Sequence, residues 1–233
     1  MARRVVIIAI VVFVAAAVLA LLGWMASQRP PEWWAPPVPG DAQAMAVAEN
    51  LERRLSEEIS RVRPDEAPWA VRLHESQLNA WLALRMPQWI AHTGQQVDAQ
   101  AQVRLVDGAI EIAMRRAGAA PEGEGPVGVL RIRPQVVDGR MHAEVDAVGL
   151  GSLALPGGVS DMAVRSAESV LRAFSEEAGG ASVDGQQTAA LAAMLRGEAT
   201  PARWSLGDGR EVELRALELA PGELVVQCAT VRR

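Results

Sequence analysis

Residues 101–114 read AQVRLVDGAIEIAM, and this stretch decides the fold because the register of a β-hairpin follows from its letters. Asp107-Gly108 is a two-residue signature of a type I′ turn, so residues facing each other across it have numbers that sum to 215. On one side the pairs are Leu105 with Ile110, Val103 with Ile112 and Ala101 with Met114. On the other side Arg104 faces Glu111, an opposite-charge pair typical of neighbouring strands.

A second hairpin follows the same rule around Asp138-Gly139, where facing residues have numbers that sum to 277. Its expected pairs are Val136 with Met141, Ile132 with Val145, Leu130 with Ala147, Arg133 with Glu144 and Arg131 with Asp146. Each hairpin has an apolar and a charged side, so we expect an antiparallel sheet of hairpins with helices on one face and solvent on the other. Pro134 cannot donate a ladder hydrogen bond and predicts an edge or a bulge there.

Helical periodicity precedes the hairpins. Asp41 is the expected N-cap of a helix that stops at Pro64, with an apolar stripe from Met45 to Val62. We expect this stripe to pack on the sheet of the same molecule, and a dimeric coiled coil is the alternative. A short strand follows, with alternating apolar residues Trp69, Val71 and Leu73. A second helix starts at Glu75-Ser76, carries Leu78, Trp81 and Leu82 on one face, and is broken at Pro87.

The C-terminal half continues the α+β pattern. We expect an irregular apolar stretch over residues 149–158, a helix that Ser160 caps and that ends at Gly179-Gly180, and a short helix after Asp184. Two strand pairs close the chain: Trp204 with Val212 around a three-residue loop, and Leu217 and Leu219 with Leu224 and Val226 around Pro221-Gly222. The sequence therefore predicts one α+β domain over residues 41–233. That this domain is extracytoplasmic follows from the N-terminal segment.

The N-terminus carries a membrane signal. Residues 5–26 are almost wholly apolar, and 22 residues of helix span about 33 Å, the thickness of a bilayer core. Arg3 and Arg4 precede this run, so we expect a short cytoplasmic tail (residues 1–4), a single transmembrane helix and an exported remainder in the cell envelope. The alternative is a signal peptide cleaved after Ala20, although its apolar region is normally only about 7 to 15 residues long.

Residues 27–40 form a Pro-rich stalk between the anchor and the domain. Five prolines enforce an extended, polyproline-like backbone, which would hold the domain off the bilayer. Trp33-Trp34 favours a second role equally well, in which the segment folds back on the domain, because paired exposed tryptophans are unusual in a spacer. The two roles stay open at this point.

Composition excludes several kinds of chemistry. The chain has no Lys and one Cys, Cys228, so lysine catalysis, a P-loop, an internal disulfide and a thiolate zinc site are excluded. The net charge of −5, and of −7 for residues 27–233, has the wrong sign for a nucleic-acid partner. No HExxH, GxSxG or GxGxxG motif occurs, so we expect no enzyme activity, no metal site and no cofactor.

The remaining candidates are apolar. Trp81, Met86 and Trp89 lie on one helical segment, and Leu153, Leu155 and Pro156 form a hydrophobic loop. The simplest interpretation is that these residues belong to the core. The functional interpretation is a groove between helix and sheet that takes the acyl chain of a lipid or another amphiphile, with the Leu153 to Pro156 loop at its mouth.

Several of these motifs resemble a known family. The run Ser76 to Leu82 (SQLNAWL) after a short strand, the strand pair around Asp138-Gly139 and the Leu153 to Pro156 loop are similar to those of the YpmS-like family of single-pass extracytoplasmic bacterial proteins. The resemblance covers about residues 69–231. It implies an architecture like that of tubular lipid-binding modules, in which a curved sheet wraps a long helix, and it implies no catalytic site. The stalk and the 41–63 helix depart from the family pattern.

The sequence thus favours a membrane-anchored extracytoplasmic module that binds a lipid or amphiphile. The alternative is a structural or interaction protein of the cell envelope, which would bind an envelope protein and no small molecule.

The topology is directly testable. A reporter fused after Arg233 should be active only if the reporter works outside the cytoplasm, because the arginine bias keeps the N-terminus inside. Activity of a cytoplasm-only reporter at the same position would reverse the orientation.

Overall fold

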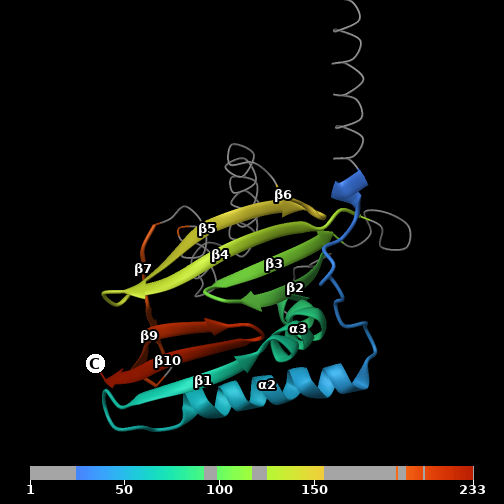
Figure 1. Ribbon diagram of the computed structural model, residues 1–233. Coiled ribbons are helices and arrows are strands. Elements are labelled where there is room, and N and C mark those ends of the chain that lie inside the picture. Colours follow the sequence, from blue (N-terminus) through green and yellow to red (C-terminus); the bar gives the residue numbers. More distant parts are fainter. Residues whose placement is uncertain are drawn as a thin grey trace, which may run out of the picture.

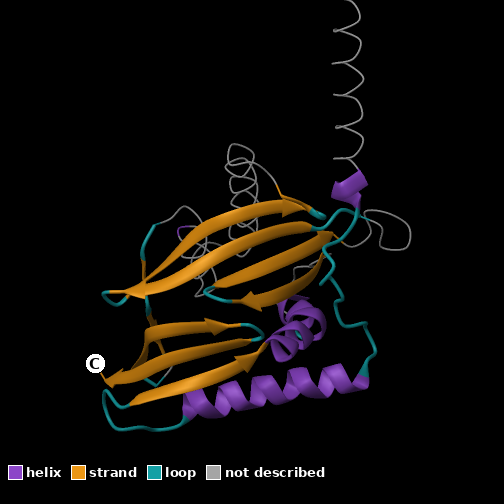
Figure 2. Cartoon of the chain, viewed as in Figure 1, coloured by secondary structure: helices purple, strands orange, loops and turns teal. Residues whose placement is uncertain are grey.

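The computed structural model describes residues 25–91, 99–116, 125–154, 193, 198–206 and 208–232. They form helices and two antiparallel sheets, so the α+β class is confirmed, with two sheets in place of one (Figures 1 and 2). The helices are α2 (Ala42–Ser60), α3 (Glu75–Leu84) and α4 (Met86–Ala91). The strands are β1 (Pro68–His74), β2 (Ala99–Val106), β3 (Ala109–Arg116), β4 (Gly128–Val137), β5 (Arg140–Leu150), β6 (Leu153–Ala154), β7 (Thr200–Pro201), β8 (Arg203–Ser205), β9 (Arg210–Ala220) and β10 (Glu223–Arg232).

The larger sheet has the order β2-β3-β4-β5-β6, with β7 paired to the start of β5. The β2–β3 register confirms the predicted hairpin pair by pair, from Ala101 with Met114 to Leu105 with Ile110. β3 pairs with β4 only as far as Ile132, so in the rest of β4 the only ladder partner is β5. Pro134 lies in that unshared part, which confirms the predicted edge.

The β4–β5 hairpin follows its predicted register only near the turn. Ile132 faces Val145 as expected, but a bulge follows, and Leu130 faces Val148 instead of Ala147. Asp146 is the extra residue of the bulge, and its carboxylate lies 3.1 Å from Arg131 Nε and 3.0 Å from Arg133. One carboxylate between two guanidinium groups stabilises the displaced position, which strand alternation alone does not predict.

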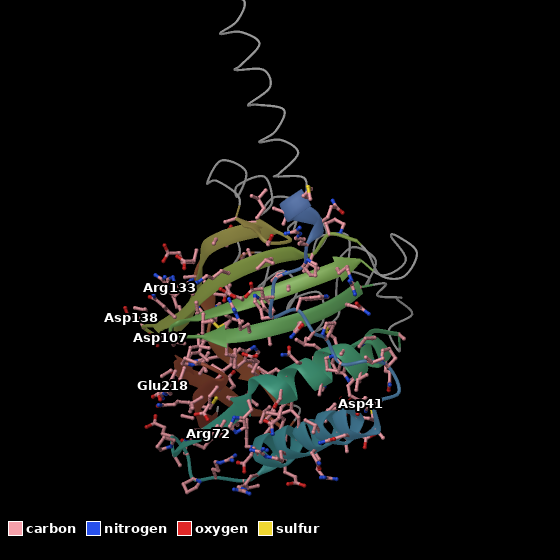
Figure 3. The ribbon with its side chains drawn as sticks, turned by 45° about the vertical axis from the view of Figure 1, so that its right-hand side comes forward. Asp41, Arg72, Asp107, Arg133, Asp138 and Glu218 are labelled. Carbon is pink, nitrogen blue, oxygen red and sulfur yellow. The ribbon has the colours of Figure 1, made fainter. Side chains whose placement is uncertain are left out.

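The two hairpin turns differ in backbone conformation, although both lie at the same end of the sheet (Figure 3). Asp138 and Gly139 both have positive φ, 51° and 69°, as a type I′ turn requires. At the other turn only Gly108 has positive φ, 65°, so the type I′ prediction for Asp107-Gly108 is wrong even though its register is right.

The smaller sheet has the order β1-β10-β9-β8. Trp204 pairs with Val212, and Leu217 and Leu219 pair with Val226 and Leu224, as predicted. A bulge in β9 leaves Arg215 without a partner residue in the ladder, so Leu214 and Leu217 lie on the same face of the sheet.

A corner of hydrogen bonds joins the two sheets along the free edge of β2. The Asn79 side-chain amide donates to the Val103 carbonyl at 2.9 Å, and the Val103 N–H donates to Asn79 Oδ1 at 2.7 Å. Next along the edge, the Leu105 N–H donates to Glu75 Oε2, and the Leu105 carbonyl accepts from the N–H of Gly222 in the β9–β10 turn. Side chains of α3 and a turn of the smaller sheet therefore replace a neighbouring strand.

The helices are fixed by caps and by one polar bridge. Asp41 accepts hydrogen bonds from the N–H groups of Gln43 and Ala44, which confirms it as the N-cap of α2. Ala48 and Leu51 are buried, and α2 packs on α3. Glu52 then accepts from Trp81 Nε1 at 2.9 Å and from Arg85, and the Arg85 guanidinium lowers the pKa of the Glu52 carboxyl.

The charged face of the larger sheet is not simply solvated, which corrects the prediction. Glu111 is only 7% exposed and pairs with both Arg104 and Arg131. Trp33 and Trp34 lie against this face, where their rings stack under guanidinium groups. The folded-back segment adds to the cover of this face, because Trp33 lies on Arg104, which pairs with Glu111.

Residues 25–35 run along the larger sheet. Gln102 accepts from the Ala35 N–H at 2.8 Å and donates to the Trp33 carbonyl, in the same two-way manner as Asn79. The Ala26 carbonyl accepts from the N–H and hydroxyl of Ser152 in the β5–β6 turn. Of the two roles considered for Trp33-Trp34, contact with the domain is the one observed.

Several sequence-based expectations lie outside the described residues. They include nearly all of the 5–26 segment, the acidic loop after 117, and the helices expected after Ser160 and Asp184. Within the described ranges, no helix combines the length and apolarity needed to cross a bilayer. Residues 149–154 are more regular than expected, since β5 turns through Gly151-Ser152 directly into β6.

Replacing Asn79 by Ala should destabilise the domain by about 2–4 kcal/mol, because it leaves the buried N–H and carbonyl of Val103 without partners. Urea unfolding of the full chain, followed by tryptophan fluorescence, measures this. Asn50→Ala, at an exposed position of α2, is the matched control and should change stability by less than about 0.5 kcal/mol. Equal effects of the two substitutions would contradict the proposed role of the corner.

Candidate functional site

An apolar groove of about 220 Å³ lies between α2 and one face of the smaller sheet. Every residue that lines it has an apolar side chain or a thiol: Leu55, Ile59, Trp69, Val71, Leu73, Trp204, Leu206, Val212, Val226 and Cys228. The residues come from α2, from all four strands of the sheet and from the β8–β9 loop. Figures 1 and 2 show α2 running beneath this sheet, at the opposite side from β6.

Strand pairing explains why these side chains meet. On β1, residues Trp69, Val71 and Leu73 alternate with exposed neighbours. Their partners on β10 are Cys228, Val226 and Leu224, so the apolar face continues across the ladder. Because of the bulge at Arg215 in β9, Leu214 and Leu217 both lie on this face. Four strands thus present one continuous apolar surface.

The apolar stripe of α2 is divided between two partners. Ala48 and Leu51, in its first half, are buried where α2 packs on α3. Leu55 and Ile59, one turn apart in the second half, face the groove. The prediction that the stripe packs on the same molecule agrees with this arrangement, but the sheet is only partly covered.

The groove is open toward β8. Trp204 is 41% exposed and Ile59 is 39% exposed, although both line it. Beyond the end of α2, Val62 is 73% exposed. Large apolar side chains at an opening are the arrangement expected where an apolar group enters.

Two arginines fix the end of the groove near the C-terminus of α2. The Arg63 guanidinium lies 4.3 Å above the Trp69 ring and pairs with Glu58. The Arg210 guanidinium donates to the carbonyls of Ser60 and Arg61 and so ties the last turn of α2 to the start of β9. These contacts hold the helix beside the sheet without filling the space between them.

Cys228 contributes an inert apolar surface. Burial raises the pKa of its thiol to about 11, against a smaller opposing effect of the Arg63 guanidinium. The thiol is therefore protonated at neutral pH, and a protonated thiol is a poor nucleophile and a poor metal ligand. Within the ranges that the structure describes, no three His, Cys, Asp or Glu side chains cluster as metal ligands would.

The site residues chosen from the sequence lie elsewhere. Trp81 is half-buried against Glu52, Met86 is half-buried at the start of α4, and Trp89 is 64% exposed. α3 packs on β2, whereas Leu153 is in β6 at the other edge of the larger sheet, so these described residues are not brought together. Leu155 and Pro156 are outside the described residues.

The groove residues carried signals in the sequence. Leu55 and Ile59 belong to the predicted stripe, and Trp69, Val71 and Trp204 to predicted strands. The sequence does not indicate that α2 lies against β8 as well as β1, because β1 follows α2 directly whereas β8 is far along the chain. Only the tertiary structure supplies it.

No protein-family model, curated protein or solved structure matches this chain. The resemblance to the YpmS-like family therefore stays a prediction.

The Cys228 thiol makes stability depend on pH in a window where little else titrates. The chain has no Tyr and no Lys, and Arg stays protonated throughout this pH range. The native thiol keeps its proton to about pH 11, whereas the unfolded thiol loses it near 9. The free energy of unfolding should therefore fall by up to about 3 kcal/mol as the pH rises from about 9 to about 11.

Urea unfolding across this pH range measures the effect. Cys228→Ala should abolish the decline, because the titrating group is then gone. An identical decline in the variant would show that the thiol is not the group responsible.

Proposed function

We propose that the protein is a membrane-anchored extracytoplasmic module that binds the acyl chain of a lipid or another amphiphile in the groove between α2 and the smaller sheet. The observation that carries this proposal is an open groove whose lining is wholly apolar. A ligand with polar groups would find few hydrogen-bond partners among these side chains, because they are hydrocarbon apart from a thiol and two indole N–H groups, of which that of Trp69 donates to Thr230. An acyl chain needs none.

The size of the groove narrows the ligand. Its volume of about 220 Å³ is smaller than a typical small-molecule pocket of about 300–1,000 Å³. It therefore suits part of one acyl chain, with the remainder and the headgroup outside. Each methylene that leaves water contributes about 0.8 kcal/mol, before the entropy of ordering the chain is subtracted. The binding affinity comes from the acyl chain and not from a negatively charged headgroup, because residues 27–233 are acidic overall and repel it.

The anchor belongs to the same proposal. The apolar run 5–26 and the arginines before it support a single-pass membrane protein with its N-terminus in the cytoplasm. A tether confines the domain to the cell envelope, where membranes supply lipids with acyl chains.

The second candidate function is a protein-interaction module of the cell envelope. The exposed apolar side chains of Ile59, Val62 and Trp204 favour it, because such residues also occur where a protein partner binds. It requires no ligand in the groove.

Filling the groove distinguishes the two functions. The full chain in phosphatidylcholine nanodiscs is irradiated with a photoactivatable palmitate, and cross-linked tryptic peptides are mapped by mass spectrometry. We expect label in residues 204–210 and 216–232, which contain groove residues. Val226→Phe, whose larger side chain occupies the groove, should lose most of this label.

Val225→Phe is the matched control. It introduces the same ring one residue away, where Val225 faces Arg72 and Glu218 on the opposite side of the sheet, and it should keep the label. Circular dichroism confirms that both variants are folded, and Leu55→Phe fills the groove from the helix side if Val226→Phe does not fold. Equal labelling of all variants would contradict acyl-chain binding in this groove.

A further inference from the structure

Where the acyl chain comes from depends on how the domain is held relative to its anchor. Residues 25–28 are helical and continue directly from the apolar run. They lie beside the β5–β6 turn, at the side of the larger sheet farthest from α2 (Figure 1). The contacts between this segment and the domain therefore set the orientation of the groove.

The first contact is a close backbone fit at Gly151. A Cβ atom at this position would lie 2.4 Å from the Ser27 carbonyl oxygen, 2.5 Å from that of Arg29 and 2.7 Å from that of Ala26. Real Cβ atoms do not approach backbone oxygens this closely, so the chain passes over this turn only because the residue is glycine. Ser152 next to it donates both its N–H and its hydroxyl to the Ala26 carbonyl, at 3.1 and 3.0 Å.

The second set of contacts lies across the sheet from the first. Gln102, which is buried in β2, holds the backbone of Trp33 and Ala35 with two hydrogen bonds. Arg104 and Arg115 stack on the rings of Trp33 and Trp34. The segment is thus attached at β5–β6 and again at β2–β3, and attachment at both ends of its path removes the swivel of a free stalk.

This attachment puts the groove at a distance from the anchor. Between β6 and β2 lie four strand spacings of about 4.8 Å, or roughly 19 Å of sheet. The smaller sheet and α2 lie beyond β2, on the side away from residues 25–28 (Figures 1 and 2). An acyl chain in the anchor's own bilayer would have to leave that bilayer completely before it reached the groove.

We infer that the groove takes acyl chains from a lipid donor separate from the bilayer that holds the anchor. The inference rests on the proposed function and adds the source of the ligand. The donor presents the acyl chain to the open side of the groove at Trp204 and Ile59. The attachment of residues 26–35 keeps the groove on the side of the larger sheet away from residues 25–28 (Figure 1).

The test supplies the same lipid from two sources. The full chain is placed in phosphatidylcholine nanodiscs, and phosphatidylcholine with a photoactivatable acyl chain is present either in the same discs or in separate protein-free vesicles. After a short incubation and irradiation, label in residues 204–210 and 216–232 is quantified by mass spectrometry. We expect severalfold more label from the separate vesicles, and its loss in Val226→Phe but not in Val225→Phe.

Releasing the attachment gives a second, independent readout. Gly151→Ala should raise the label from the same discs severalfold, because the domain can then turn its groove toward its own bilayer. Gly108→Ala is the matched control, since Gly108 has nearly the same φ (65° against 61°) but open space around it, and it should leave the label unchanged. Ser152→Ala, which removes only the hydroxyl contact, replaces Gly151→Ala if that variant does not fold.

The outcomes separate the two claims. Label that is lost in Val226→Phe but arrives equally or preferentially from the same discs would overturn the inference about the donor and leave the groove function standing. Label that is absent from both sources, or that persists in Val226→Phe, would overturn the proposed function itself. No change of same-disc label in Gly151→Ala would show that the attachment does not set the orientation.

Discussion

The hydrogen bonds along the edge of β2 are the constraint on which the rest of the structure depends. An edge strand presents unpaired N–H and carbonyl groups, which are costly when buried. Here Asn79 supplies one donor and one acceptor to the same residue, Val103, as a neighbouring strand would. The side-chain amides of Asn and Gln suit this role because each carries a donor and an acceptor on the same planar group, as a peptide unit does. Gln102 uses the same chemistry to hold the backbone at Trp33 and Ala35.

The position of α3 then determines the groove. Because Glu75 and Asn79 are fixed at β2, α3 lies along that edge and buries Ala80 and Leu84. α2 packs on α3 with the first half of its apolar stripe, and so its second half projects under the smaller sheet. One helix is too narrow to cover a four-stranded apolar face. The uncovered remainder is the groove, and its hydrophobic exposure is the reason for regarding it as functional.

Local features of the fold could be predicted from the sequence. The register of the β2–β3 hairpin, the Asp41 cap, and the Trp204–Val212 and Leu219–Leu224 pairs follow from turn chemistry and alternation within short segments. The bulges at Asp146 and Arg215 could not, because pairing by strict alternation gives every residue one partner and leaves no place for an extra residue. The division into two sheets depends on contacts between α3 and β2. Neither segment carries a sequence pattern that identifies the other as its partner.

The candidate site could be predicted only in parts. The stripe containing Leu55 and Ile59 and the strands containing Trp69 and Trp204 were each identified, but a sequence pattern does not say which apolar faces oppose one another. Aromatic residues clustered on one helical segment predict a site at Trp81 and Trp89, whereas the structure gives Trp81 a polar partner, Glu52. A tryptophan that donates a hydrogen bond to a carboxylate looks, in the sequence alone, like any other apolar residue.

Hydrogen exchange at the β2 edge tests the central claim most directly. In an uncovered edge strand the outward-facing amides exchange rapidly, because only water bonds them. The corner of Asn79 and Glu75 predicts that the Val103 and Leu105 amides exchange as slowly as that of Leu214, which bonds to the Ala202 carbonyl inside the smaller sheet. Rapid exchange at Val103 and Leu105, at the rate of exposed loop amides, would contradict the account.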